Sequence, residues 1–108
     1  MGATGCAPNR LQLIAGVASR LTMSKTRRLG PFNVSPIGMG CMNISHAYGE
    51  PPSAEQGERV LLAALDAGYT LMDTAALYGF GANETLIGRV LKTHRKNFVL
   101  TSKCGLTG

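Results

Sequence analysis

Short apolar runs alternate with amphipathic segments through most of the chain, and this alternation constrains the fold more than any other feature. Apolar runs at 37–42, 69–72 and 98–105 predict three strands that end in small or polar residues. Between them, residues 53–68 and 83–96 carry apolar side chains at helical spacing. The strands recur about every thirty residues, the length of a β-α-β unit. Such units build parallel sheets with helices outside.

Residues at the helix ends indicate where each helix begins and stops. Ser53 with Gln56 three residues later matches a capping box, and Gly68 is a natural end for that helix. We predict that Asn83 caps the second helix and that Glu84 interacts with the helix dipole. The apolar side chains expected to be buried are Val60, Leu61, Ala64 and Leu65 of the first helix and Leu86, Ile87, Val90 and Leu91 of the second. The cations expected in the last turn of the second helix are Lys92, His94, Arg95 and Lys96.

The N-terminal quarter differs from the rest. Gly30-Pro31 separates two short extended pieces of residues 27–38, which predicts a β-hairpin. Residues 1–26 are interpreted as a separate extension, disordered or leader-like. Because residues 1–22 contain no acid, an organellar leader is an alternative to a dispensable extension before a second methionine, Met23.

Composition narrows the class of protein. The 108 residues fit one small domain, and 44% hydrophobic content provides a core. No stretch approaches the roughly 18 apolar residues of a membrane span. The net charge of +5 is scattered rather than interleaved with aromatic residues, which favours an anionic cofactor or substrate over nucleic acid.

The three cysteines have no CxxC spacing, and neither histidine lies at a metal-ligand spacing from them. We therefore expect neither a disulfide framework nor a metal site. Reduced thiols are typical of a cytoplasmic protein. Cys41 and Cys104 flank the candidate site, and both are expected to be buried and inert.

Three polar residues follow the later strands. Asp73 comes directly after the 69–72 run, and Lys103 lies near the end of the last one. Functional groups of α/β barrels gather at the carboxyl ends of strands. Because adjacent strands lie about 4.8 Å apart, an acid and an amine at equal height can form an ion pair. Tyr78, on the loop after Asp73, can fold back over that pair.

This trio indicates a specific chemistry. A free phenol with a pKa near 10 is a slow acid, whereas a nearby ammonium favours the phenolate. Tyr78 would then protonate a carbonyl oxygen while a hydride reaches the carbon. No side chain supplies a hydride, so a nicotinamide cofactor is implied. Taken singly, Asp73 could be a loop cap, Tyr78 a packed aromatic and Lys103 a solvated strand end; their combination favours a site.

These residues carry a family resemblance. "DTAALYGFGANE" at 73–84 resembles the aldo-keto reductase signature, and "LGPFNVSPIGMGCM" at 29–42 resembles that family's N-terminal hairpin and first barrel strand. "TSKCG" at 101–105 resembles its lysine strand. The resemblance implies an α/β fold for residues 27–108: the N-terminal part of a (β/α)8 TIM barrel, with a hairpin and about three parallel strands alternating with two helices.

The resemblance also implies an activity. Asp73, Tyr78 and Lys103 would be three members of a catalytic tetrad that reduces a small-molecule aldehyde or ketone with NADPH. Gly40, Cys41 and Met42 would lie near the nicotinamide, together with Asp73.

The fourth tetrad member in that family is a histidine at the end of the fourth strand, and neither His46 nor His94 matches it. We therefore expect the chain alone to have negligible turnover. One alternative is a non-catalytic interaction module, or a piece resembling a regulatory subunit, that binds a partner through open strand edges. Another is the product of a wrong gene boundary.

Overall fold

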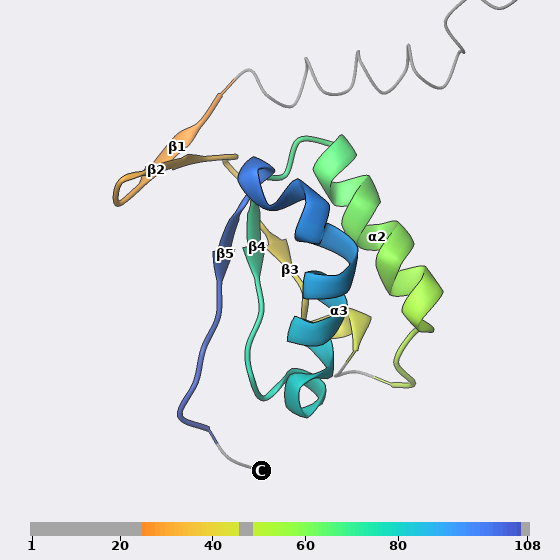
Figure 1. Cartoon of the computed structure of the whole chain (residues 1–108). Helices are drawn as coiled ribbons and strands as arrows, with labels where there is room; N and C mark the ends of the chain where they lie inside the picture. The colour runs from red at the N-terminus through yellow and green to blue at the C-terminus, as the bar shows by residue number, and fades with distance from the viewer. Residues whose placement is uncertain (1–24, 46–48, 107–108) are drawn as a thin grey trace, which may run out of the picture.

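The computed structural model describes residues 25–45 and 49–106. Its strands form a separate hairpin and a parallel sheet with the order β3-β4-β5 (Figure 1). This arrangement confirms the predicted hairpin and the predicted order of strands and helices. The extension assigned to 1–26 lies, apart from residues 25 and 26, outside the described residues, as does His46. The strands are β1 (Arg27–Leu29), β2 (Phe32–Val34), β3 (Met39–Gly40), β4 (Leu71–Asp73) and β5 (Val99–Thr101).

Helix α2 (Ala54–Asp66) begins and ends as its sequence predicts. The backbone N–H of Gln56 donates to Ser53 Oγ at 3.2 Å, and the N–H of Ser53 donates to Gln56 Oε1 at 3.0 Å. These reciprocal bonds satisfy two N–H groups that would otherwise have no partner in the first turn. At the other end, Gly68 follows the C-cap residue with φ 95°, a left-handed conformation that glycine adopts without steric cost.

Helix α3 (Ala82–Leu91) begins differently from the prediction. Gly81 occupies the N-cap position, and Asn83 lies inside the helix, so its assignment as the cap is wrong. The reason is that the Asn83 amide is buried and hydrogen-bonds to other loops. The cations expected in the last α-helical turn belong instead to a 3-10 helix, η4 (Lys92–Asn97).

The strands are shorter than the apolar runs that predicted them. The run at 37–42 yields only β3, because its last residue begins the 3-10 helix η2 (Met42–Ile44). Ile37 is 66% exposed, so this run is not buried throughout. Strand β4 begins at Leu71 rather than at residue 69. Hydrophobic periodicity marks apolar segments well, but it does not mark where ladder pairing starts.

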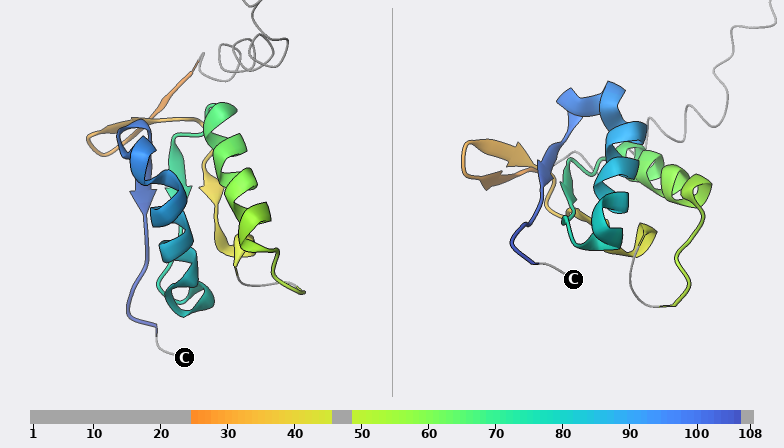
Figure 2. Two further views of the ribbon diagram at one scale, coloured as in Figure 1. Left: turned by 45° about the vertical axis from the view of Figure 1, so that its right-hand side comes forward. Right: turned by 60° about the horizontal axis from the view of Figure 1, so that its bottom comes forward.

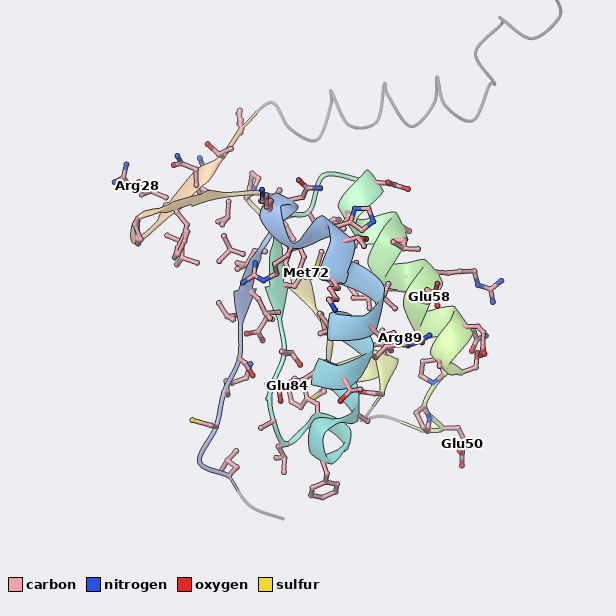
Figure 3. All side chains as sticks on the ribbon, in the orientation of Figure 1. Arg28, Glu50, Glu58, Met72, Glu84 and Arg89 are labelled. Carbon is pink, nitrogen blue, oxygen red and sulfur yellow. The ribbon has the colours of Figure 1, made fainter. Side chains whose placement is uncertain are left out.

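Both helices cover the same face of the parallel sheet (Figure 2). Met72, on the central strand, is 0% exposed between the sheet and the helices (Figure 3). Val60 is 44% exposed, so its assignment to the buried stripe of α2 is wrong; Gly57 is buried instead. The core cluster consists of Cys41, Ile44, Leu61, Ala64, Met72, Leu86, Ile87, Leu91 and Phe98.

Within the part of the chain that the structure describes, no helix is long and apolar enough to cross a bilayer. The same residues contain no group of three or more His, Cys, Asp or Glu side chains that could hold a metal ion.

Gly57 sits at the contact between the two helices, and its size sets how closely they approach. A Cβ added there would lie 2.9 Å from Leu86 Cδ2 and 3.6 Å from the Ile44 carbonyl oxygen. The Leu86 methyl would have to shift, and this cost opposes the helix-propensity gain of alanine, so we expect Gly57→Ala to raise the free energy of unfolding by less than the control below, or to lower it, measured by urea denaturation.

Gly88 of α3 is the matched control, because a Cβ added there meets nothing within 4 Å. Gly88→Ala should raise the free energy of unfolding by about 0.5–1 kcal/mol through helix propensity alone. Equal gains for both substitutions would show that the two helices do not approach closely at Gly57.

Candidate active site

The ends of β4 and β5 bring an acid and an amine together. Lys103 Nζ donates to Asp73 Oδ2 at 2.7 Å and to the Thr74 carbonyl oxygen at 2.8 Å. Thr101, the register partner of Asp73, donates from Oγ1 to Asp73 Oδ1 at 2.7 Å. Each carboxylate oxygen therefore has a hydrogen-bond donor. The predicted ion pair is present in the structure.

Backbone pairing continues past the strands and delivers Lys103 to this position. The Thr74 N–H donates to the Thr101 carbonyl at 2.9 Å, and the Ala76 N–H donates to the Lys103 carbonyl at 2.9 Å. The two segments thus run side by side beyond the last assigned strand residue. The lysine backbone is fixed against the loop that carries the acid.

The loop after β4 turns Tyr78 over the pair. Lys103 Nζ lies 5.3 Å from the centroid of the Tyr78 ring, within the range of a cation–π contact. Tyr78 opens the 3-10 helix η3 (Tyr78–Gly81), inside which Gly79 and Phe80 have φ of 60° and 52°. Phe80 pays a steric penalty of about 1–2 kcal/mol for this left-handed conformation. This strain lies at the turn where the loop after β4 reverses its direction.

The ion pair shifts the pKa values of Asp73 and Lys103 in opposite directions. Burial raises the pKa of Asp73, but hydrogen bonds from Lys103 and Thr101 outweigh it, so the pKa lies below its ordinary range. The hydrogen bond to Asp73 raises the pKa of Lys103, with partial burial opposing. Both groups are therefore charged across the neutral range.

The residues predicted to line the cofactor lie beside the pair. Gly40 is the register partner of Asp73, and the Cys41 N–H donates to the Asp73 carbonyl at 2.9 Å. Met42 follows as the first residue of η2. A Cβ added at Gly40 would meet nothing within 4 Å, so this side of the strand end is open. Their role toward a cofactor stays a prediction.

The two cysteines near the site differ. Cys41 is 0% exposed, and burial raises its pKa to about 11, so its thiol stays protonated in the core. Only its backbone reaches the site. Cys104 is exposed, so the expectation that it is buried is wrong. The reason is that the segment after β5 pairs with the loop after β4 through its backbone, while its residues 102–106 are exposed. Figure 1 shows this segment extending away from the helices.

Concave surface at the site is limited. A pocket of about 100 Å³ is lined by Ala75, Leu77, Tyr78, Lys103, Cys104 and Leu106. Small-molecule sites usually have about 300–1,000 Å³. The described residues therefore form one wall of a site and not a complete one.

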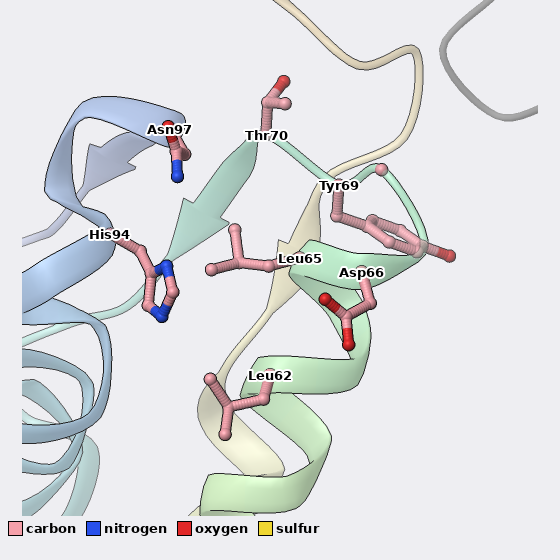
Figure 4. Close-up of a pocket in the computed structure, with 8 residues that line it drawn as sticks. Leu62, Leu65, Asp66, Tyr69, Thr70, His94 and Asn97 are labelled. Atoms are coloured by element: carbon pink, nitrogen blue, oxygen red, sulfur yellow. The ribbon is translucent and has the colours of Figure 1, made fainter. Parts of the chain in front are cut away.

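A larger pocket of about 450 Å³ lies at the other end of the sheet, between the end of α2 and η4 (Figure 4). His94, Asp66 and Tyr69 contribute to its lining. None of the predicted site residues belongs to it. His94 is thus separated from the ion pair, as the sequence indicates.

The residues that sequence reasoning missed are in the first turn of α3. Thr74 Oγ1 donates to Asn83 Oδ1 at 2.6 Å, and Asn83 Nδ2 donates to the Cys41 carbonyl at 2.7 Å and to Ser45 Oγ. Ser102 Oγ donates to Glu84 Oε1 at 2.6 Å. Asn83 and Glu84 stand at the start of a helix, where such residues are typical of an N-cap and of an interaction with the helix dipole. The neighbouring sequence contains no pattern that indicates their partners on other loops.

The pH dependence of the ion pair is testable on Lys103. Its raised pKa stabilises the fold below the ordinary value of 10.5, and this contribution is lost as pH rises through the folded pKa. The lowered pKa of Asp73 stabilises the fold above 3.8 and is lost as pH falls through its folded pKa. Asp73→Asn should return the pKa of Lys103 toward its ordinary value, measured by the pH titration of its Cε resonance in NMR spectra.

The control is Glu58→Gln, which breaks the ion pair between Glu58 and Arg89 on the helices, where the two charged groups are 3.8 Å apart (Figure 3). It should leave the Lys103 titration unchanged. A Lys103 midpoint that does not respond to Asp73→Asn would contradict the pairing.

The sequence matches a known protein family. The model of the aldo/keto reductase family matches residues 36–108. The chain is 45% identical over 82 residues to an aldo-keto reductase of Schizosaccharomyces pombe whose name specifies NADP(+). It is 40% identical over 76 residues to a probable aldo-keto reductase of soybean, Glycine max. These matches cover 74% and 69% of this chain but 24% and 22% of the relatives, so the chain spans about a quarter of their length.

Solved structures agree in fold. An aldo-keto reductase of Bacillus halodurans in its holo form aligns with a TM-score of 0.66 at 34% identity, over 75% of this chain and 26% of that one. An aldo/keto reductase from Klebsiella pneumoniae, in complex with NADP and acetate, aligns with a TM-score of 0.63 at 32% identity, over 74% of this chain and 28% of that one. The described elements correspond to an N-terminal part of a (β/α)8 barrel. The chain therefore belongs to the aldo/keto reductase family.

Proposed function

We propose that this chain contributes the proton-donating part of an NADP-dependent oxidoreductase that reduces an aldehyde or ketone. The observation that carries the proposal is the Lys103 ammonium, held 2.7 Å from Asp73 Oδ2 and 5.3 Å from the Tyr78 ring centroid. An acid, an amine and a phenol at adjacent strand ends suit proton transfer to a carbonyl oxygen.

Each of the three side chains has a distinct task. Tyr78 donates its phenolic proton to the carbonyl oxygen and becomes a phenolate. The Lys103 ammonium stabilises that negative charge, since a nearby cation favours the ionised form of a phenol. Asp73 keeps the ammonium charged and in place through its hydrogen bond. NADPH, when bound, supplies the hydride that the carbonyl carbon receives.

Residues next to the pair suit a flat cofactor ring. The open side of Gly40 leaves room above the strand end, and the backbone of Cys41 adjoins Asp73. We propose that Gly40, Cys41, Met42 and Asp73 approach the nicotinamide. The name of the S. pombe relative and the NADP in the Klebsiella structure support NADP as the cofactor.

The described residues supply one wall of a site, so we propose that the 108-residue chain alone has negligible turnover. The experiment is a chimera in which this chain replaces the matching segment of the S. pombe relative. The chimera should oxidise NADPH in the presence of a generic aromatic aldehyde. Tyr78→Phe in the chimera should lower kcat about 10²–10⁴-fold, the usual contribution of a general acid.

Tyr69→Phe is the matched control, because Tyr69 lies in the pocket at the other end of the sheet. It should leave kcat unchanged. A chimera that folds and binds NADPH but keeps full activity with Tyr78→Phe would refute the assignment. A chimera that binds NADPH and never turns over would instead favour the non-catalytic alternative.

A further inference from the structure

The first turn of α3 contacts the ends of all three parallel strands. Asn83 reaches the loops after β3 and β4, and Glu84 reaches the segment after β5 through Ser102. Glu84 and Ser102 are exposed, whereas Asn83 is 0% exposed. Because Asn83 is buried, water cannot replace the hydrogen bonds that its partners would lose if it were removed.

The hydrogen bonds of Asn83 connect it to Lys103 through Thr74. Its Oδ1 accepts from Thr74 Oγ1 at 2.6 Å, and the carbonyl of the same Thr74 accepts from Lys103 Nζ at 2.8 Å. Thr74 is itself 0% exposed, and its N–H pairs with Thr101. Side chain, N–H and carbonyl of this one residue are thus each fixed by a different partner.

The other end of the Asn83 amide fixes the neighbouring loop. Its Nδ2 donates to the Cys41 carbonyl at 2.7 Å and to Ser45 Oγ. Cys41 in turn pairs with the Asp73 carbonyl. A single primary amide, with two donors and one acceptor engaged, therefore joins the loop after β3 to Thr74, the residue that follows the acid.

We propose that Asn83 is a positioning residue for the candidate active site: through the Thr74 hydroxyl it orients the Thr74 carbonyl that, with Asp73, holds the Lys103 ammonium. This inference rests on the proposed function, because positioning Lys103 matters only if its ammonium takes part in the reaction. It also accounts for a buried polar side chain in a helix where an apolar one would otherwise pack.

The test follows the Lys103 Cε resonance against pH in the full 108-residue chain. The charged and titratable groups facing the ammonium are Asp73 and Tyr78. Thr74→Val removes the hydroxyl at nearly constant shape, and Thr74→Ser keeps it. We expect the Lys103 midpoint to fall slightly in Thr74→Val and in Asn83→Ala, by less than in Asp73→Asn because the Asp73 carboxylate is still present, and to stay at the wild-type value in Thr74→Ser.

Thr85→Val is the control for a change on the same helical turn, since Thr85 is exposed, and it should titrate as wild type. If Asn83→Ala fails to fold, the comparison of Thr74→Val with Thr74→Ser is the test. A purely structural role of the Thr74 hydroxyl would give the same Lys103 midpoint in both variants. Folded Thr74→Val with a wild-type midpoint overturns the inference and leaves the proposed function standing. A Lys103 midpoint that is unchanged in Asp73→Asn overturns both the inference and the proposed function.

Discussion

Parallel pairing of β4 with a strand on each side is the constraint on which the rest of this structure depends. In that register Asp73 stands between Gly40 and Thr101, so one carboxylate faces both neighbouring strand ends. Continued pairing beyond β5 then brings Lys103 within 2.7 Å of it. A slip of one residue in β4 would move Asp73 to the opposite face of the sheet, toward the helices, and separate the pair.

The site and the core are held by different kinds of force at the same strand ends. Met72 and Cys41 are fully buried against the helices, whereas Asp73, the residue after Met72, is half-exposed and charged. Alternation along a strand explains this, because successive side chains face opposite sides. Asn83 and Thr74 are the buried polar residues among those described, and the three hydrogen bonds of the Asn83 amide, one of them to the Thr74 hydroxyl, offset the cost of burial.

Much of this arrangement could be predicted from the chain. The capping box at Ser53, the hairpin at Gly30-Pro31 and the strand-helix order rest on local residue preferences, and they are present in the structure. So is the meeting of Asp73 with Lys103, because two parallel strands of similar length must end at one edge. The N-cap at Asn83, the burial of Val60 and that of Cys104 were wrong, since each depends on what lies opposite the residue in space.

The sequence by itself determined the order and approximate places of the strands and helices, and that an acid, a phenol and an amine follow the strands, because periodicity and loop chemistry are local properties. Only the tertiary structure decided that Thr74 bonds Lys103 through its carbonyl and Asn83 through its hydroxyl. Those partners are 29 and 9 residues away from Thr74 along the chain. Hydrogen bonds between distant segments require the packed geometry that fixes both ends, and no local pattern of residues encodes it.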